Sequence, residues 1–309
     1  MDATEYHIPV MLQESIDALS VKPDGTYFDL TYGGGGHSRE ILRRLRGKGK
    51  LYGFDQDADA ALQVPKGENR FTFIRSNFRF LENWARFYKA TDADGILADL
   101  GVSSHHFDTP ERGFSFRFDS PLDMRMNQNA SLTASDVLNG YDEAKLTLLL
   151  KHYGELSGAR RIAKAIIKRR ERGPMHTVAD LTSIVEPLLT RGREKKEMAK
   201  LFQALRIEVN AEMEALSQML QAAVKVLKPG GRLVVLTYHS IEDRMVKNLM
   251  RDGNVEGQSQ QDFFGRRLSP FKSVGTKVMV PSTLEQEVNP RSRSAKLRVA
   301  ERIATEFES

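Results

Sequence analysis

The 309-residue chain contains no cysteine, which excludes disulfide bonds, thiolate nucleophiles and cysteine-ligated zinc. It has no apolar run near the roughly 20 residues that a membrane-spanning helix needs. Its first residues carry neither the basic nor the apolar region of a secretion signal. No internal repeat or low-complexity segment stands out. We therefore expect a cytoplasmic protein that is not associated with a membrane.

The charged residues that are present are slightly unbalanced, with 46 Lys and Arg against 41 Asp and Glu and a net charge of +5. A basic balance favours a polyanionic partner such as nucleic acid, although many mildly basic proteins bind nothing anionic. Apolar residues make up 40% of the chain, which is enough for a substantial core. The length predicts one large domain or two smaller ones.

Strand and helix patterns alternate over the first hundred residues, which predicts a parallel sheet covered on both faces. The elements expected there are helix 9–20, strand 27–31, helix 38–46, strand 50–55, helix 57–63, strand 71–75, helix 79–89 and strand 95–100. A second stretch predicts helices alone, at 142–152, 159–171, 177–189 and 194–208. The alternation resumes with helix 211–227, strand 232–237, helix 241–251 and a last strand at 296–300. We expect an α/β domain (1–105 and 211–309) interrupted by an inserted helical domain (106–210).

Four consecutive glycines, 33–36, follow the first strand and precede a helix. Glycines allow a sharp turn and a close approach to a ligand, and the helix directs its free N–H groups at that turn. Asp55 ends the second strand roughly 20 residues further on, where an acidic side chain meets ribose hydroxyls in nucleotide sites. The pattern indicates a nucleotide-type cofactor; the alternative is that the glycines merely turn the chain.

Three features favour S-adenosylmethionine (SAM) over NAD as this cofactor. Asp99 ends a strand at the carboxyl edge of the sheet, where ligands of open α/β sheets bind. Phe78 follows the third strand and could pack on adenine. The helix–Lys-Pro-Gly-Gly–strand sequence at 227–233 is common in class I methyltransferases and unusual in dehydrogenases. A nicotinamide-dependent oxidoreductase remains an alternative, although Ser38 replaces the third glycine of the dinucleotide fingerprint.

Six short sequence motifs, which occur in a fixed order over nearly the whole chain, support the prediction of a SAM-dependent methyltransferase. They are Tyr32–Arg39 (YGGGGHSR), Asp99–Ser104 (DLGVSS), Arg112–Phe116 (RGFSF), Pro121–Met126 (PLDMRM), His239–Arg244 (HSIEDR) and Asn289–Arg291 (NPR). Together they resemble the MraW/RsmH family, bacterial 16S rRNA cytosine-N4 methyltransferases. The resemblance implies a Rossmann-like class I SAM-dependent methyltransferase domain with an inserted all-helical substrate domain. It also implies that the protein acts on 16S rRNA within the small ribosomal subunit.

The resemblance also implies which residues contact the cofactor: Gly35, Gly36, His37, Asp55, Phe78 and Asp99. His106 occupies an adenine-side position where the family often has Gln. Candidates for catalysis are Asp99, which could accept from the target amine or position the cofactor, and His239 and Asp123 near the base. His239 could equally be a capping or core histidine. A non-catalytic ribosome-assembly factor that keeps SAM as a structural ligand is the remaining alternative.

Basic side chains and phenylalanines point to RNA contact. The expected helix 159–171 carries Arg160, Arg161, Lys164 and Lys168, and a second basic segment carries Arg291 and Arg293. The loop 107–118 holds four phenylalanines, which could stack on an extruded base or could instead form a seam between domains. Adjacent residues rarely point the same way, so the pair His105-His106 predicts no metal site.

Overall fold

The computed structural model describes residues 9–101, 109–265 and 267–304. The chain divides into two compact units. One comprises Met1–Gly101 and Glu214–Ser309 and is here called the α/β unit; the other comprises Val102–Met213 and is called the helical unit. Assignment of the helical unit to substrate recognition stays a prediction.

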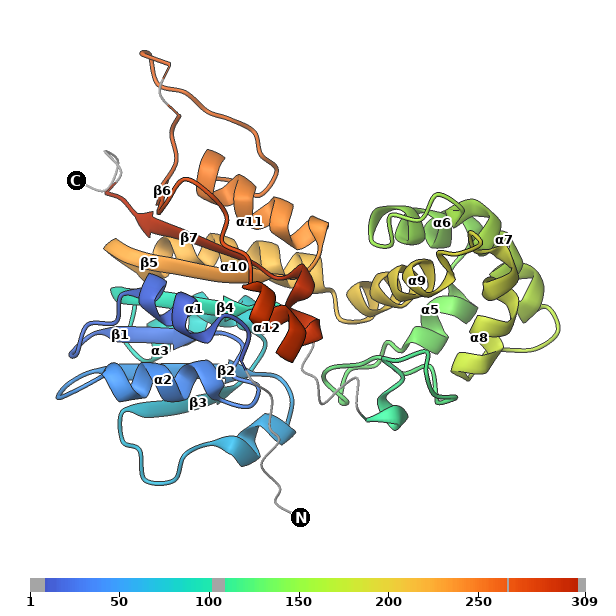
Figure 1. Cartoon of the computed structure of the whole chain (residues 1–309), viewed down its shortest axis with the longest axis horizontal. Coiled ribbons are helices and arrows are strands. Elements are labelled where there is room, and N and C mark those ends of the chain that lie inside the picture. The colour runs from blue at the N-terminus through green and yellow to red at the C-terminus, as the bar shows by residue number, and fades with distance from the viewer. Residues whose placement is uncertain (1–8, 102–108, 266, 305–309) are drawn as a thin grey trace. The chain divides into compact units, whose positions relative to one another are not determined.

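A seven-stranded sheet forms the centre of the α/β unit, in the order β3-β2-β1-β4-β5-β7-β6 (Figure 1). The strands are β1 Thr26–Asp29, β2 Lys50–Asp55, β3 Phe71–Arg75, β4 Ala93–Asp99, β5 Leu227–Thr237, β6 Phe271–Ser273 and β7 Lys296–Arg302. β1 to β5 are parallel, and β7 runs antiparallel to both of its neighbours. This topology confirms the expected Rossmann-like α/β class, and it brings the carboxyl ends of five strands to one edge.

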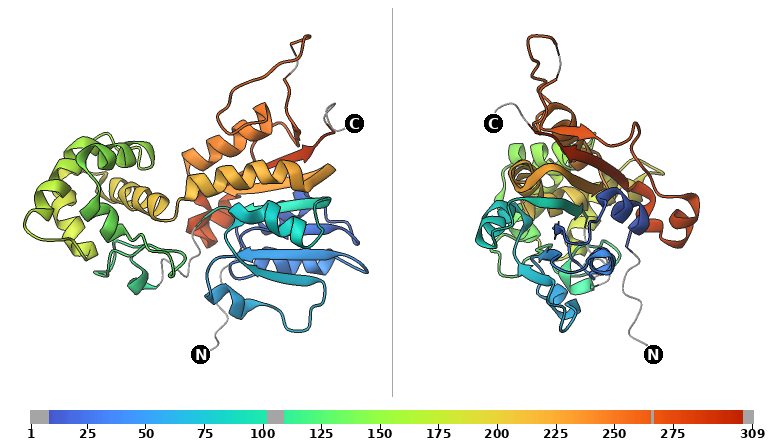
Figure 2. Two further views of the ribbon diagram at one scale, coloured as in Figure 1. Left: turned by 180° about the vertical axis from the view of Figure 1, so that it is seen from behind. Right: turned by 90° about the vertical axis from the view of Figure 1, so that its left-hand side faces the viewer.

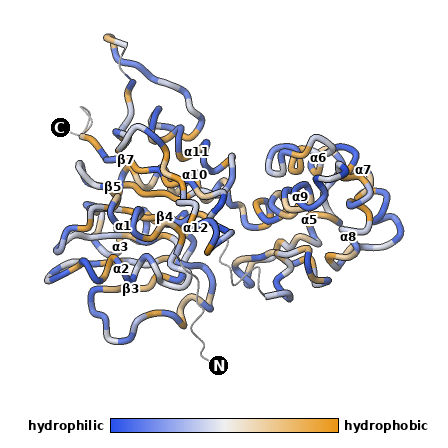
Figure 3. Tube along the Cα trace, viewed as in Figure 1, coloured by the Kyte–Doolittle hydropathy of each residue, from blue (hydrophilic) through white to orange (hydrophobic). Residues whose placement is uncertain are grey.

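Helices cover both faces of this sheet, as a parallel sheet requires. α1 (Leu12–Leu19) and α2 (Gly36–Arg44) lie on the face seen in Figure 1. α3 (Leu81–Phe87) and α10 (Glu212–Val226) lie on the other face, seen from behind in Figure 2, and an ion pair of 2.9 Å joins Lys225 to Glu82 between them. The central strand β4 and the second half of β5, residues 233–237, are largely hydrophobic (Figure 3) and almost wholly buried, because both of their faces are covered.

The remaining elements of the α/β unit include three differences from expectation. Residues 59–63 form a 3₁₀ helix where an α-helix is expected. α11 (Ser240–Asp252) follows β5 as expected, but β6 and α12 (Thr283–Val288) were missed, because each is too short to show a hydrophobic period. None of the helices in the described part of the chain is long and apolar enough to cross a bilayer.

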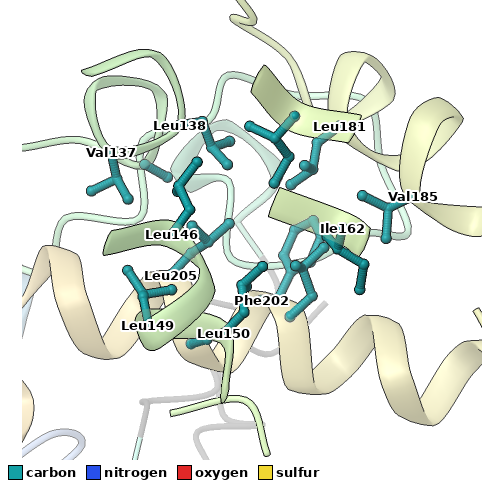
Figure 4. Close-up of a cluster of buried hydrophobic side chains, with 14 of the residues drawn as sticks. Val137, Leu138, Leu146, Leu149, Leu150, Ile162, Leu181, Val185, Phe202 and Leu205 are labelled. Carbon is teal, nitrogen blue, oxygen red and sulfur yellow. The ribbon is translucent and has the colours of Figure 1, made fainter. Parts of the chain in front are cut away.

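The helical unit contains α5 Ala134–Gly140, α6 Glu143–His152, α7 Ala159–Arg170, α8 Val178–Val185 and α9 Glu194–Val209. Capping boxes start α5 and α8, in which Thr133 pairs with Asp136 and Thr177 with Asp180. Leucine, isoleucine, valine and phenylalanine side chains from all five helices fill one core (Figure 4). Each such buried side chain stabilises the unit by about 1.5–3 kcal/mol relative to exposure.

Candidate active site

The carboxyl edge of the sheet brings Asp55 into direct contact with the glycine turn. The N–H of Gly33 donates to Asp55 Oδ2 at 2.9 Å, and the N–H of Asp57 donates to Oδ1 at 2.8 Å. The backbone N–H of Tyr32 also donates to the carbonyl of Phe54 in β2, at 2.8 Å. The carboxylate predicted to meet a ribose thus also holds the turn after β1 in place.

Gly36 and Gly35 both need to be glycine in this turn. A Cβ at Gly36 would lie 2.1 Å from Cγ of Pro9, and Gly35 is restricted by its backbone as well. Its φ is 73°, in the left-handed region, and it is the N-cap of α2. A Cβ at this position would lie 2.6 Å from the hydroxyl of Tyr32, which itself donates to the carbonyl of Gln63 at 2.7 Å. Because the first N–H groups of a helix have no acceptor within it, α2 offers a group of donors at this edge.

His37 lies in the first turn of α2 with its ring buried. Its Nε2 is 3.2 Å from the carbonyl oxygen of Val10, so the side chain joins α2 to the segment before α1. A part for His37 in cofactor binding therefore rests on its backbone, and it stays a prediction.

Asp29, at the end of β1, also holds the glycine turn in place, through hydrogen bonds to residues on either side of it. It was not among the residues predicted from the sequence. The hydroxyl of Ser38 donates to its Oδ2 at 2.6 Å, and the N–H of Thr31 donates to Oδ1 at 3.2 Å. Burial raises the pKa of Asp29 above its ordinary value, against the opposing effects of His37 and Ser38. Its place at a strand end, before the glycines, was the signal available in the sequence.

Phe78 begins a 3₁₀ turn, Phe78–Phe80, directly after β3. The side chain of Asn77 caps this turn by accepting from the N–H of Arg79 at 3.0 Å. The amide of Asn77 also donates to Gln56 Oε1 at 3.1 Å, which links the turn after β3 to the one after β2. The ring of Phe78 is half-buried, as a ring at the rim of a nucleotide site would be, and its contact with adenine stays a prediction.

Asp99 lies at the end of β4 and is held by two neighbours from different strands. The hydroxyl of Tyr238, just after β5, donates to Asp99 Oδ1 at 2.6 Å. The backbone N–H of Asp99 donates to the hydroxyl of Thr31 at 2.6 Å. Neither partner was identified from the sequence, although both follow strands that end at this edge.

His239 is the N-cap residue of α11, which is the structural alternative to a catalytic role that the sequence left open. Its Nδ1 accepts from the N–H of Glu242 at 3.5 Å, and the Glu242 carboxylate accepts from the N–H of His239 at 3.1 Å. The two side chains are also close, with His239 Nε2 3.0 Å from Glu242 Oε2, and both are nearly inaccessible to solvent. A catalytic role for His239 stays a prediction, now with a structural role beside it.

Asp123 belongs to the helical unit, whereas Asp99 and His239 belong to the α/β unit. Its two carboxylate oxygens accept from the guanidinium of Arg125 at 2.9 and 2.6 Å. Burial opposes ionisation of Asp123, but the Arg125 hydrogen bonds and charge outweigh it and lower its pKa. Asp123 is therefore a fixed, ionised carboxylate, suited to accepting a hydrogen bond rather than to releasing a proton.

The basic residues of α7 separate into two groups. Arg160, Arg161, Lys164 and Lys168, the four predicted to bind RNA, are exposed. Arg160 lies 3.5 Å from Glu143 and the guanidinium of Arg161 donates to the carbonyl of Leu188. Arg169 and Arg170 instead bind groups within the unit: Arg169 pairs with Asp180 at 2.8 Å, and Arg170 donates to two carbonyls at 3.0 and 2.6 Å.

The second basic segment divides in the same way. Arg291 and Arg293 lie exposed in a 3₁₀ turn, Pro290–Ser294. Lys296 and Arg298, in β7, both bind Asp243 of α11, at 3.1 and 2.6 Å. RNA contact by Arg291 and Arg293 stays a prediction, whereas the charges of Lys296 and Arg298 are committed to a contact within the fold.

Among the phenylalanines of loop 107–118, the three that the structure describes do not form one surface. Phe114 is buried in the core of the helical unit, and Phe116 packs edge-to-face on Phe202 with ring centroids 5.5 Å apart. Phe118 is 46% exposed and could stack on a base. His106, His105 and Phe107 lie outside the described residues, so the expected cofactor contact of His106 stays a prediction.

Comparison with known proteins tests the family that these residues resemble. The family model described as the MraW methylase family matches residues 4–303. A protein from Bacteroides fragilis named Ribosomal RNA small subunit methyltransferase H is 59% identical over 301 residues, covering 97% of this chain and 99% of that protein. One of the same name from Porphyromonas gingivalis is 55% identical, over 96% and 97% of the two chains.

Solved structures are more distant. A SAM-dependent O-methyltransferase from Thermotoga maritima covers 98% of this chain and 69% of its own, at 10% identity and a TM-score of 0.41, a likeness too weak to add to the assignment. The sheet topology and the family match over nearly the whole chain agree with each other. The chain belongs to the MraW methylase family.

Proposed function

We propose that this protein transfers a methyl group from SAM to the exocyclic N4 amine of a cytosine in the decoding region of 16S rRNA. The observation that carries the proposal is the match to the methylase family over residues 4–303, in a fold whose carboxyl edge presents the glycine turn, Asp55 and Asp99 together. Such an enzyme would work in the cytoplasm on the small subunit or its RNA.

The residues at the sheet edge fit SAM. Glycine at position 35 allows the left-handed turn that begins α2, and the α2 N–H groups suit a carboxylate. Asp55 suits ribose hydroxyls, and the half-buried ring of Phe78 suits adenine. Membership of a methylase family argues against the nicotinamide-dependent alternative.

The bound cofactor supplies a methyl group on a positively charged sulfur, a reactive donor with a good leaving group. The protein's main task is therefore to hold the amine in line with that bond. The amine lone pair is delocalised into the cytosine ring, so an acceptor near N4 favours the reactive form and offsets developing positive charge. Asp99, with its carboxylate fixed at the sheet edge, is the first candidate, and His239 and Asp123 stay candidates beside the base.

The target base must leave its stack before it can reach the methyl group. Contacts to the RNA backbone are needed to hold the substrate while this happens, and the exposed residues Arg160, Arg161, Lys164 and Lys168 form a basic face suited to phosphates. Arg291 and Arg293 would supply further contacts from the α/β unit.

The test is to incubate the purified protein and labelled SAM with small subunits and with free 16S rRNA, both from cells lacking the enzyme. Mass spectrometry of the nucleosides should find labelled N4-methylcytidine, and Asp99→Asn should reduce it. Label on another nucleoside or position would reject N4 specificity. If the protein binds adenosylhomocysteine tightly yet transfers no label to either substrate, the non-catalytic assembly factor becomes the better account.

A further inference from the structure

The side chain of Tyr238 contacts Asp99, the candidate acceptor for the target amine, directly. β5 runs parallel to β4 with Leu236 paired to Asp99, so the chain continues past the end of β4 by two residues to Tyr238. From there the phenol donates to Asp99 Oδ1 at 2.6 Å, a short bond typical of a hydroxyl donating to a charged oxygen.

The ring of Tyr238 is itself held on several sides. Its backbone N–H donates to the buried carboxylate of Glu242. Its ring lies against the backbone at Gly101, where a Cβ would be 3.1 Å from the ring atom Cε2. The ring also packs on the core cluster that joins α1 to the sheet. A phenol fixed in this way can impose one orientation on the carboxylate it contacts.

We propose that Tyr238 is the positioning residue for Asp99 in methyl transfer. Its hydroxyl fixes the rotation of the Asp99 carboxyl group, while Thr31 fixes the backbone of the same residue. This inference rests on the proposed function, in which Asp99 acts at the reacting amine or positions the cofactor.

The charged groups around Tyr238 keep its hydroxyl protonated, as the role requires. Burial raises the pKa of Tyr238 well above its ordinary value, and the carboxylates of Asp99, Glu242 and Glu285 raise it further. The phenol therefore remains a hydrogen-bond donor across the pH range in which the enzyme can be assayed.

The experiment compares Tyr238→Phe with wild type, since this change keeps the ring and removes only the hydroxyl. The control is Tyr27→Phe, which also removes a hydroxyl with a hydrogen bond of 2.7 Å, from the N–H of Lys22 at the opposite end of the strands. For Tyr238→Phe we expect kcat to fall about 10- to 100-fold, the effect of losing a hydrogen bond to a charged group. For Tyr27→Phe we expect kcat within twofold of wild type.

A double-mutant cycle separates positioning from a general structural effect. If Tyr238 acts through Asp99, adding Tyr238→Phe to Asp99→Asn should lower the residual rate by less than threefold. Additive losses, or a Tyr238→Phe rate within twofold of wild type, would overturn the inference. A wild-type protein that methylates no cytosine would instead reject the proposed function, so the two failures are distinguishable.

Discussion

Replacing Gly35 with alanine tests whether the glycine turn is the cofactor site. At a φ of 73°, alanine is disfavoured by about 1–2 kcal/mol. The added Cβ would also lie 2.6 Å from the hydroxyl and 2.8 Å from Cζ of Tyr32. That ring cannot swing away freely, because it donates to Gln63 and stacks on Phe71 with centroids 5.2 Å apart. The backbone of the turn must move instead.

The expected cost follows from these two effects. Relieving the contact adds roughly 1–3 kcal/mol, as for other overpacked sites, so Gly35→Ala should lower the free energy of unfolding by about 2–5 kcal/mol. Because the displaced turn carries the N–H donors of α2, we expect affinity for adenosylhomocysteine to fall at least about 10-fold, or about 1.4 kcal/mol. Calorimetric titration measures the affinity, and denaturant unfolding measures the stability.

Gly67→Ala is the matched control. Gly67 has a φ of 77° in the same unit, but a Cβ there would meet nothing within 4 Å. This variant should show only the conformational cost of about 1–2 kcal/mol, with cofactor affinity unchanged. If Gly35→Ala binds adenosylhomocysteine as tightly as wild type, the turn is not the cofactor site and the reasoning fails.

Three other changes test the helical unit, its basic face and the ion pairs that Asp243 forms with Lys296 and Arg298. Neutralising Arg160, Arg161 and Lys164 together should weaken RNA binding and reduce the slope of log K against log salt by about 2, as roughly three phosphate contacts are lost. Phe116→Ala should destabilise the helical unit by about 2–3 kcal/mol through lost packing on Phe202, measured by denaturant unfolding. Asp243→Asn should remove part of the loss of stability at acid pH, measured as Tm from pH 7 to pH 3.

The sign of the pH effect follows from Asp243. Burial raises its pKa, but hydrogen bonds and charge from Arg298 and Lys296 outweigh this and lower it below the ordinary value of an aspartate. Its stabilising contribution is therefore present above the ordinary carboxyl pKa and is lost as the pH falls through the lower, folded value. An Asn variant whose Tm declines with acid as steeply as wild type would contradict this account.

Controls for the other two changes use similar residues elsewhere. Neutralising three exposed lysines of the α/β unit, Lys48, Lys66 and Lys272, alters net charge equally and should leave the salt slope nearly unchanged. Phe118→Ala removes an exposed ring and should cost little stability. If the slope of log K against log salt is the same for the α7 variant and wild type, α7 does not contact the RNA.

The elements that the sequence predicted well are those with a strong local pattern. The strands ending at Asp55 and Asp99 are buried apolar runs, and polar residues that end such runs must lie at one edge of a parallel sheet. The missed strand β6 has three residues, and its pairing with β7 depends on chain more than twenty residues away. No short-range pattern encodes such a pairing.

The site was less predictable because its contacts join distant parts of the chain. The partner of His37 is the carbonyl of Val10, 27 residues away, and the partner of Asp99 is Tyr238, 139 residues away. His239 differs, because the capping box it forms with Glu242 has a local spacing that the sequence displays. The three-residue spacing between His239 and Glu242 therefore indicates a capping role from the sequence alone.

The hydrogen bond from the Gly33 N–H to Asp55 has a thermodynamic consequence. The group expected to meet the ribose and the turn expected to meet the amino-acid portion of the cofactor are joined without any intermediate residue. A ligand fragment that orders Asp55 therefore lowers the entropy that is lost when a second fragment orders the glycine turn. Binding of the nucleoside part and of the amino-acid part of the cofactor is coupled in this way. Adenosine and homocysteine, offered together, should each bind more tightly than either does alone.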